Sequence, residues 1–168
     1  MSESLRYVIF RTRWGWFGLL GTERGLLRSC LPVDYREAKK QLLADLGLCR
    51  ADAGFFAGLQ EQIKAYFEGA CVDFANTPVV LDGLGEFGRA ILSACRKIEY
   101  GRTVSYGEVA RLAGRGAAGR AAGTILAKNS VPLIIPCHRV IRRDGQIGGF
   151  SAPGGIKLKE KMLRLESF

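Results

Sequence analysis

The sequence has 168 residues, of which 48% are hydrophobic, and a formal net charge of +9. This length predicts one domain or two small ones with enough chain for a core, and no apolar run approaches the roughly 20 residues that a membrane span needs. The five cysteines are odd in number, widely spaced and without a C-x-x-C pair, which argues against a disulfide framework or a zinc finger. Residues 1–4 lack the pattern of a signal peptide, so we expect a cytoplasmic protein, nucleoid-associated, or nuclear in a eukaryote.

The first half of the chain predicts a small α+β lobe. Short apolar runs over residues 5–10, 16–20 and 26–31, joined by glycine turns, predict a three-stranded antiparallel sheet. Helical spacing of apolar residues then predicts one helix from Tyr35 to Gly47 and a second over residues 55–69. We place the boundary of this N-terminal α+β lobe, residues 1–80, in the connector that follows.

The second half, residues 81–168, predicts a mostly helical lobe. A helix is expected to end before Gly101, and Ser105 followed by Glu108 forms a capping box that starts another. After a glycine turn, a further helix over residues 117–127 is built largely from alanine and glycine. Two short helices around such a turn are typical of a helix-turn-helix or of any helical hairpin. A closing helix is expected over residues 157–165.

Positive charge is concentrated in this second half. Residues 1–83 hold ten Lys/Arg and ten Asp/Glu, whereas residues 84–168 hold fifteen and six. A basic half beside a neutral one indicates a polyanionic partner such as nucleic acid, although a generic basic surface gives the same count.

The only histidine of the chain, His138, directly follows Cys137. Pro136 stiffens the approach to this cysteine, and a nearby base can activate a thiol as a nucleophile. Taken alone, the dipeptide also fits a buried structural cysteine beside a chance histidine.

With its flanks, the motif resembles one family, the O6-alkylguanine-DNA alkyltransferases, or methylated-DNA–protein-cysteine methyltransferases. The resemblance is carried by Pro136–Val140, by Asn129–Pro132, by the helix start at Ser105-Tyr106-Gly107, by Arg120 and by Glu166. It is close over residues 84–168 and looser before them, where only a hairpin from Trp14 to Leu26 looks familiar.

The resemblance implies a DNA repair reaction in which Cys137, as a thiolate, takes an alkyl group from O6-alkylguanine, and from O4-alkylthymine, once and irreversibly. His138 would act as general base through a water and would be oriented by Glu166. Tyr106 would donate a proton to the leaving guanine and crowd the neighbouring phosphate. Arg120 would fill the stack after the damaged nucleotide has flipped out of the duplex.

The resemblance also implies binding of double-stranded DNA through the minor groove by a monomer, with cooperative binding left open. The residues expected to contact DNA besides Tyr106 and Arg120 are Ser105, Arg115, Ala121 and Gly123. The residues expected to contact the base are Val140, Phe150, Ser151 and Leu126, and Asn129 is expected to be a structural hinge.

Three departures from the family pattern concern Phe150, the loop 151–155 and zinc. Many relatives have tyrosine at the position of Phe150, and the loop is about one residue longer than in some of them. The N-terminal lobe lacks the histidines that bind zinc in some relatives, so we expect no metal and no cofactor.

Three other classes fit parts of the pattern less well. A non-catalytic lesion reader would replace Cys137, and a sequence-specific regulator would need longer side chains on its recognition helix. A Cys-His hydrolase normally takes its histidine from a distant part of the chain.

Overall fold

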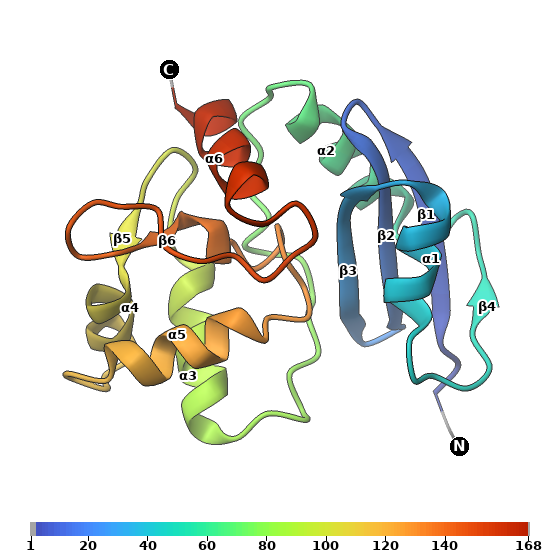
Figure 1. The fold of residues 1–168 in the computed structure, drawn as a ribbon. Helices are drawn as coiled ribbons and strands as arrows, with labels where there is room; N and C mark the ends of the chain where they lie inside the picture. The colour runs from blue at the N-terminus through green and yellow to red at the C-terminus, as the bar shows by residue number, and fades with distance from the viewer. Residues whose placement is uncertain (1–2, 168) are drawn as a thin grey trace. The chain divides into compact units, whose positions relative to one another are not determined.

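The computed structural model describes residues 3–167 and has a mixed α+β fold. The chain forms two compact units (Figure 1). One holds the described residues up to Val72 together with Asn76–Val80, and the other holds Asp73–Ala75 and the residues from Leu81 onward. The assignment of functions to lobes 1–80 and 81–168 stays a prediction.

The first unit is built on a sheet of four strands, not the three that the sequence predicts. Strands β1 (Arg6–Thr12), β2 (Gly15–Thr22) and β3 (Gly25–Val33) form the expected antiparallel meander. The fourth strand, β4 (Arg50–Ala51), adds to the free edge of β1 in parallel orientation. It has two exposed residues, so no apolar alternation marks it in the sequence.

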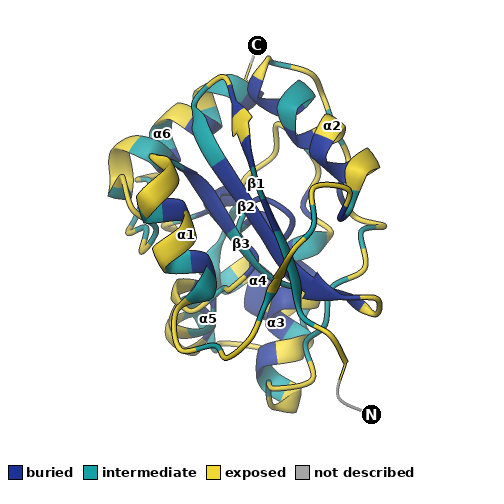
Figure 2. Cartoon of the chain, turned by 90° about the vertical axis from the view of Figure 1, so that its right-hand side faces the viewer, coloured by how far each residue is buried: buried dark blue, intermediate teal, exposed yellow. Residues whose placement is uncertain are grey.

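Two helices cover the sheet. Figure 2 shows in dark blue that many residues of the strands are buried. Helix α1 (Tyr35–Leu43) places Leu42 within 3.0 Å of the position that a Cβ on Gly18 would take. Helix α2 (Ala57–Phe67) brings the Phe67 ring to 6.0 Å from that of Phe17. Because neighbouring residues of a strand face opposite sides, α1 and α2 pack on opposite faces of β2.

The second unit is mostly helical. Its helices are α3 (Glu86–Arg96), α4 (Tyr106–Leu112), α5 (Gly119–Ala127) and α6 (Gly155–Glu166), and the 3-10 turn η1 (Cys137–Arg139) lies between α5 and α6. Helices α4 and α5 form a helical hairpin that packs on α3. The turn between them contains Gly114 and Gly116, both at positive φ. No helix within residues 3–167 is long and apolar enough to cross a membrane.

A second, two-stranded sheet positions the site. Strand β5 (Val104–Ser105) pairs in parallel with β6 (Val140–Ile141), and Val104 lies opposite Val140. This pairing fixes the start of α4 beside the end of η1 (Figure 1). Residues that lie more than 30 positions apart in the sequence therefore meet at one point.

Candidate active site

Cys137 is held at the start of η1 by a tightly bonded loop. The side chain of Asn129 donates to the carbonyl oxygen of Ile135 at 2.9 Å and accepts from the amide of Val131 at 3.0 Å. The amide of Cys137 in turn donates to Ile135 at 2.8 Å. Asn129 therefore braces the segment that carries the thiol, and its role as a hinge stays a prediction.

Burial raises the pKa of the Cys137 thiol, and several groups oppose this effect. A hydrogen bond with Asn129, the positive charge of Lys159 and the backbone amides of Cys137 and His138 lower the pKa. The thiol therefore needs a base to become a nucleophile.

His138 is the residue that the sequence predicts as this base, and its role stays a prediction. Its ring is buried, and Nε2 lies 2.7 Å from Oε1 of Glu166. Within residues 3–167, the buried Nδ1 atom has no hydrogen-bond partner from the protein. Because a carboxylate can only accept, Nε2 carries the proton and Nδ1 keeps a free lone pair.

Arg139 fixes the charge of Glu166. Its Nε and Nη2 atoms each lie 2.9 Å from an oxygen of the Glu166 carboxylate, and Nη1 donates to the carbonyl of Ile98 at 2.7 Å. Burial alone would raise the pKa of Glu166, but hydrogen bonds and charge from His138 and Arg139 lower it to about 2. Glu166 is thus a permanent anion that accepts from both neighbours.

The pKa of His138 is lowered because the ring is buried, and the charges of Arg139 and Lys159 act in the same direction. The hydrogen bond to Glu166 and its charge raise this pKa but do not outweigh burial. His138 is therefore neutral near pH 7 and free to accept a proton at Nδ1.

A pocket of about 390 Å³ opens in front of Cys137. Its walls come from α4, α5 and the glycine-rich loop, with Tyr106, Leu126 and Phe150 among the lining side chains. The hydroxyl of Ser151 donates to the carbonyl of Ala127 at 2.6 Å and ties this loop to the end of α5. The pocket has the dimensions of a small-molecule site, and Cys137 is one of its lining residues.

We compared the chain with protein-family models, with curated proteins and with solved structures. Residues 86–168 match the family model of the 6-O-methylguanine DNA methyltransferase DNA-binding domain. The methylated-DNA–protein-cysteine methyltransferase of Methanosarcina acetivorans is 33% identical over 160 residues, which cover 95% of this chain and 97% of that relative. This chain belongs to the methylated-DNA–protein-cysteine methyltransferases.

Other members of the family are also similar to this chain in sequence or in structure. The relative from Methanothermobacter thermautotrophicus is 43% identical over 108 residues, which are 64% of this chain and 59% of that protein. The crystal structure of O6-methylguanine methyltransferase from Mycobacterium tuberculosis superimposes with a TM-score of 0.77 at 30% identity, over 96% of this chain and 92% of that one. A structure of the Mycobacterium tuberculosis protein in complex with DNA gives a TM-score of 0.78 at 31% identity.

The structure brings together most residues that the sequence nominates for the chemistry of this methyltransferase. Tyr106 lines the pocket together with Cys137, and burial raises the pKa of its hydroxyl, so the group stays protonated. Gly123 lies against the Tyr106 ring, where a Cβ would meet ring carbons at 3.6 Å. Gly123 therefore packs against the pocket, although the sequence assigns it to the DNA contact.

The residues expected to bind DNA fall into two groups. Arg120 and Ala121 are exposed on α5 and free to meet a partner. Ser105 instead caps α4, accepting from the amide of Glu108 at 3.1 Å. Arg115 pairs with Glu86 at 3.3 Å. Contacts of these four residues with DNA stay predictions.

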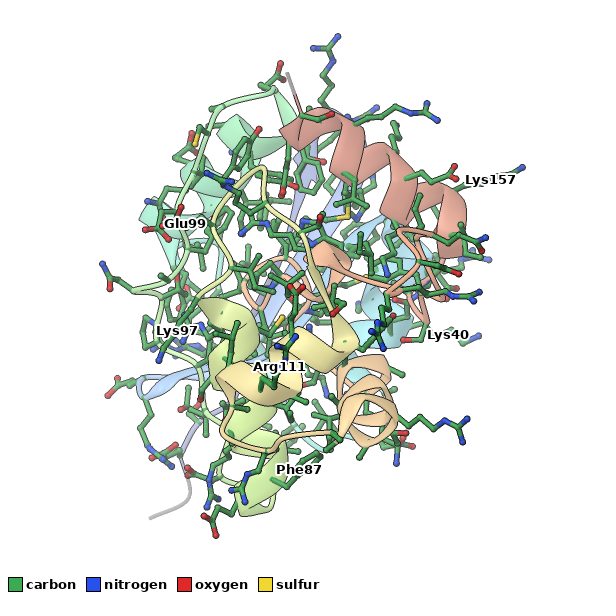
Figure 3. All side chains as sticks on the ribbon, turned by 90° about the vertical axis from the view of Figure 1, so that its left-hand side faces the viewer. Lys40, Phe87, Lys97, Glu99, Arg111 and Lys157 are labelled. Atoms are coloured by element: carbon green, nitrogen blue, oxygen red, sulfur yellow. The ribbon has the colours of Figure 1, made fainter. Side chains whose placement is uncertain are left out.

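Sequence reasoning missed Lys159, which is 1% exposed. Its Nζ donates to the carbonyl of Val140 at 2.7 Å and to that of Gly149 at 3.2 Å, and lies 5.8 Å from the centre of the Tyr106 ring. Burial lowers its pKa to about 8, although Cys137 acts against this shift. Lys157, two residues earlier, extends away from the ribbon (Figure 3).

The helical spacing of residues in α6 is a sequence signal for the burial of Lys159. Lys159 precedes Met162 by three residues and Glu166 by seven, and both are buried, so the three share one face of α6. The sequence likewise predicts no role for Arg139, although this residue stands inside the cysteine motif.

Val140 was expected to read the guanine through its carbonyl oxygen, and this oxygen already accepts from Lys159. A carbonyl has two lone pairs, so it can accept a second hydrogen bond from a base. Among residues 3–167, no cluster of three or more His, Cys, Asp or Glu side chains is placed to hold a metal ion.

Proposed function

We propose that this chain repairs DNA by moving the alkyl group of O6-alkylguanine, and of O4-alkylthymine, irreversibly to the sulfur of Cys137. The observation that carries the proposal is the position of this thiol. It faces a pocket and precedes a neutral His138 that is hydrogen-bonded to an ionised Glu166, in a member of this methyltransferase family.

The proposed reaction is one displacement at the alkyl carbon. Nδ1 of His138 takes the thiol proton through a water molecule, and the sulfur attacks the carbon bound to O6. A carbon–sulfur bond forms and the carbon–oxygen bond breaks, with its electron pair left on the guanine. Tyr106, kept protonated by its raised pKa, donates a proton to the leaving base.

The product is a thioether, which water does not cleave under physiological conditions. Each molecule therefore acts once and needs no cofactor. Two cations assist this displacement without touching the substrate. Arg139 keeps Glu166 charged, and Lys159 places a positive charge near the thiolate.

We further propose that α4 and α5 bind the minor groove of duplex DNA. The small side chains of α5 allow close approach, and exposed Arg120 can enter the stack where the damaged nucleotide leaves. Unstacking costs a few kcal/mol and costs least for a damaged pair. The protein would act as a monomer, and a cytoplasmic location with access to DNA is part of this proposal.

Replacing the nucleophile tests the function. Cys137→Ala is expected to keep binding to a duplex with one O6-methylguanine and to lose transfer completely, whereas Cys71→Ala, which alters an exposed thiol, keeps both. Transfer by Cys137→Ala would refute the assignment. Tight binding without transfer by the unmodified chain would make it a lesion reader.

A further inference from the structure

The chain between α3 and β5 makes a tight turn. The amide of Arg102 donates to the carbonyl oxygen of Glu99 at 3.1 Å, and Gly101 has a φ of +76°. A positive φ at the third of four residues is the geometry of a type II turn. Glu99, labelled in Figure 3, is exposed, whereas Tyr100 is half-buried. The turn is anchored by α3 before it and by the pairing of β5 with β6 after it.

The hydroxyl of Tyr100 binds the end of α6 next to Glu166. It donates to the carbonyl oxygen of Leu165 at 3.2 Å. The last four carbonyl groups of a helix have no partner within the helix, and the final turn frays unless other groups bind them. Glu166 is the last residue of α6, so this hydrogen bond holds the turn that carries the carboxylate.

The ring of Tyr100 faces another partner of that carboxylate. The guanidinium carbon of Arg139 lies 5.8 Å from the centre of the ring, which is within the range of a cation–π contact. Nη1 of Arg139 also donates to the carbonyl of Ile98 at 2.7 Å, two residues earlier in the same segment. The segment therefore holds the arginine at two points, while the arginine binds both oxygens of Glu166.

The carboxylate of Glu166 meets two donors at each oxygen. Oε1 lies 2.7 Å from Nε2 of His138 and 2.9 Å from Nη2 of Arg139. Oε2 accepts from Nε of Arg139 at 2.9 Å and from the amide of Gly101 in a longer bond of 3.4 Å. Because a carboxylate has about four lone-pair sites, these donors determine its orientation. A shift of the last turn of α6 would disturb all four contacts.

We propose that Tyr100 is a positioning residue for alkyl transfer, whose hydroxyl holds the last turn of α6 and whose ring holds Arg139, so that Glu166 stays aligned with His138. This inference rests on the proposed function and adds no contact with the substrate. Tyr100 is not among the residues that line the alkyl pocket. Its effect on the chemistry is therefore expected to pass through Glu166.

The pH dependence of the reaction with free O6-benzylguanine tests this role. Tyr100→Phe keeps the ring and removes the hydroxyl, and it should slow the single-turnover rate about fivefold, the factor for one neutral hydrogen bond. The reaction needs neutral His138, and Glu166 raises the pKa of this histidine. A looser contact raises the pKa less, so the acid limb of the profile should move to lower pH. Arg139 and Lys159, whose charges lower the same pKa, stay in place when the ring is kept.

Tyr35→Phe is the matched control, because Tyr35 is an exposed residue of α1, and it should change neither the rate nor the profile. Urea unfolding of Tyr100→Phe separates positioning from a merely structural role, which would lower stability without moving the profile. An unchanged rate and profile in Tyr100→Phe, with or without a loss of stability, would overturn the proposal.

A double-mutant cycle shows whether Tyr100 acts through the carboxylate. In a Glu166→Gln background, adding Tyr100→Phe should leave the rate within about twofold, because the contact that the hydroxyl supports is already lost. A further loss of about fivefold in the double variant would overturn the proposal. Failure of the unmodified chain to transfer from any substrate would instead refute the proposed function.

Discussion

Nε2 of His138 lies 2.7 Å from the carboxylate of Glu166, and both groups are buried. This contact fixes the histidine tautomer, so that the free lone pair is on Nδ1. Glu166→Gln would let the amide donate to Nε2, which moves the proton to Nδ1 and removes the base.

We therefore expect Glu166→Gln to slow the reaction with O6-benzylguanine by about 10²-fold or more, measured as a single-turnover rate. Glu160→Gln, another replacement on α6, should react at the normal rate. Circular dichroism must show that the variant is folded. A rate near that of the unmodified chain in folded Glu166→Gln would contradict the role of the pair.

Acid should destabilise the protein through the same carboxylate. The pKa of Glu166 is about 2 in the folded chain instead of 4.5, so the unfolded state binds more protons between these values. Stability is full above pH 4.5 and falls by about 3 kcal/mol as the pH drops to 2. Urea unfolding at several pH values measures this loss, and Glu166→Gln should show a smaller one.

Removing the charge of Lys159 should raise the pKa of the Cys137 thiol, because this charge lowers it. Alkylation by iodoacetamide, mapped to Cys137 by peptide analysis, should shift to higher pH in Lys159→Met. Lys159→Arg should restore part of the shift, and Lys157→Met should leave the profile unchanged. A profile unaffected by Lys159→Met would show that the amine only holds the loop.

The loop beside Tyr106 should tolerate a methyl group at Gly149 but not at Gly148. Gly148 has φ +77°, and a Cβ there would come within 3.2 Å of the Tyr106 hydroxyl. At Gly149 a Cβ would meet nothing within 4 Å. Gly148→Ala should cost about 1 kcal/mol of stability and slow the reaction with the bulky benzyl substrate. Equal behaviour of the two variants would argue against this crowding.

Arg120→Ala should separate extrusion of the base from the chemistry. Repair in duplex DNA is expected to slow strongly, since nothing then fills the stack, while the reaction with free O6-benzylguanine changes little. Equal losses on both substrates would mean that Arg120 does not assist base flipping.

The sequence predicts those parts of the molecule that local patterns determine. Short apolar runs joined by glycine turns predict the meander, and the Ser105–Glu108 box predicts the start of α4, which the structure confirms. The proposed nucleophile and its proposed base are neighbours in the chain, so one motif predicts both.

What the sequence does not reveal depends on tertiary pairing. Strands β4 and β5 have two residues each and gain their hydrogen bonds only from partners distant in the sequence. Lys159 looks like one of three alternating surface lysines until the buried face of α6 is known. The link from Arg139 to Glu166 spans 27 residues and has no local signature.

Intact-mass spectrometry with peptide mapping, after mixing the protein with a duplex that carries one O6-methylguanine, tests the central claim most directly. We expect a gain of one methyl group per protein molecule, located on Cys137, with no further turnover when more substrate is added. An unchanged mass, a methyl group on another residue or repeated turnover would contradict it.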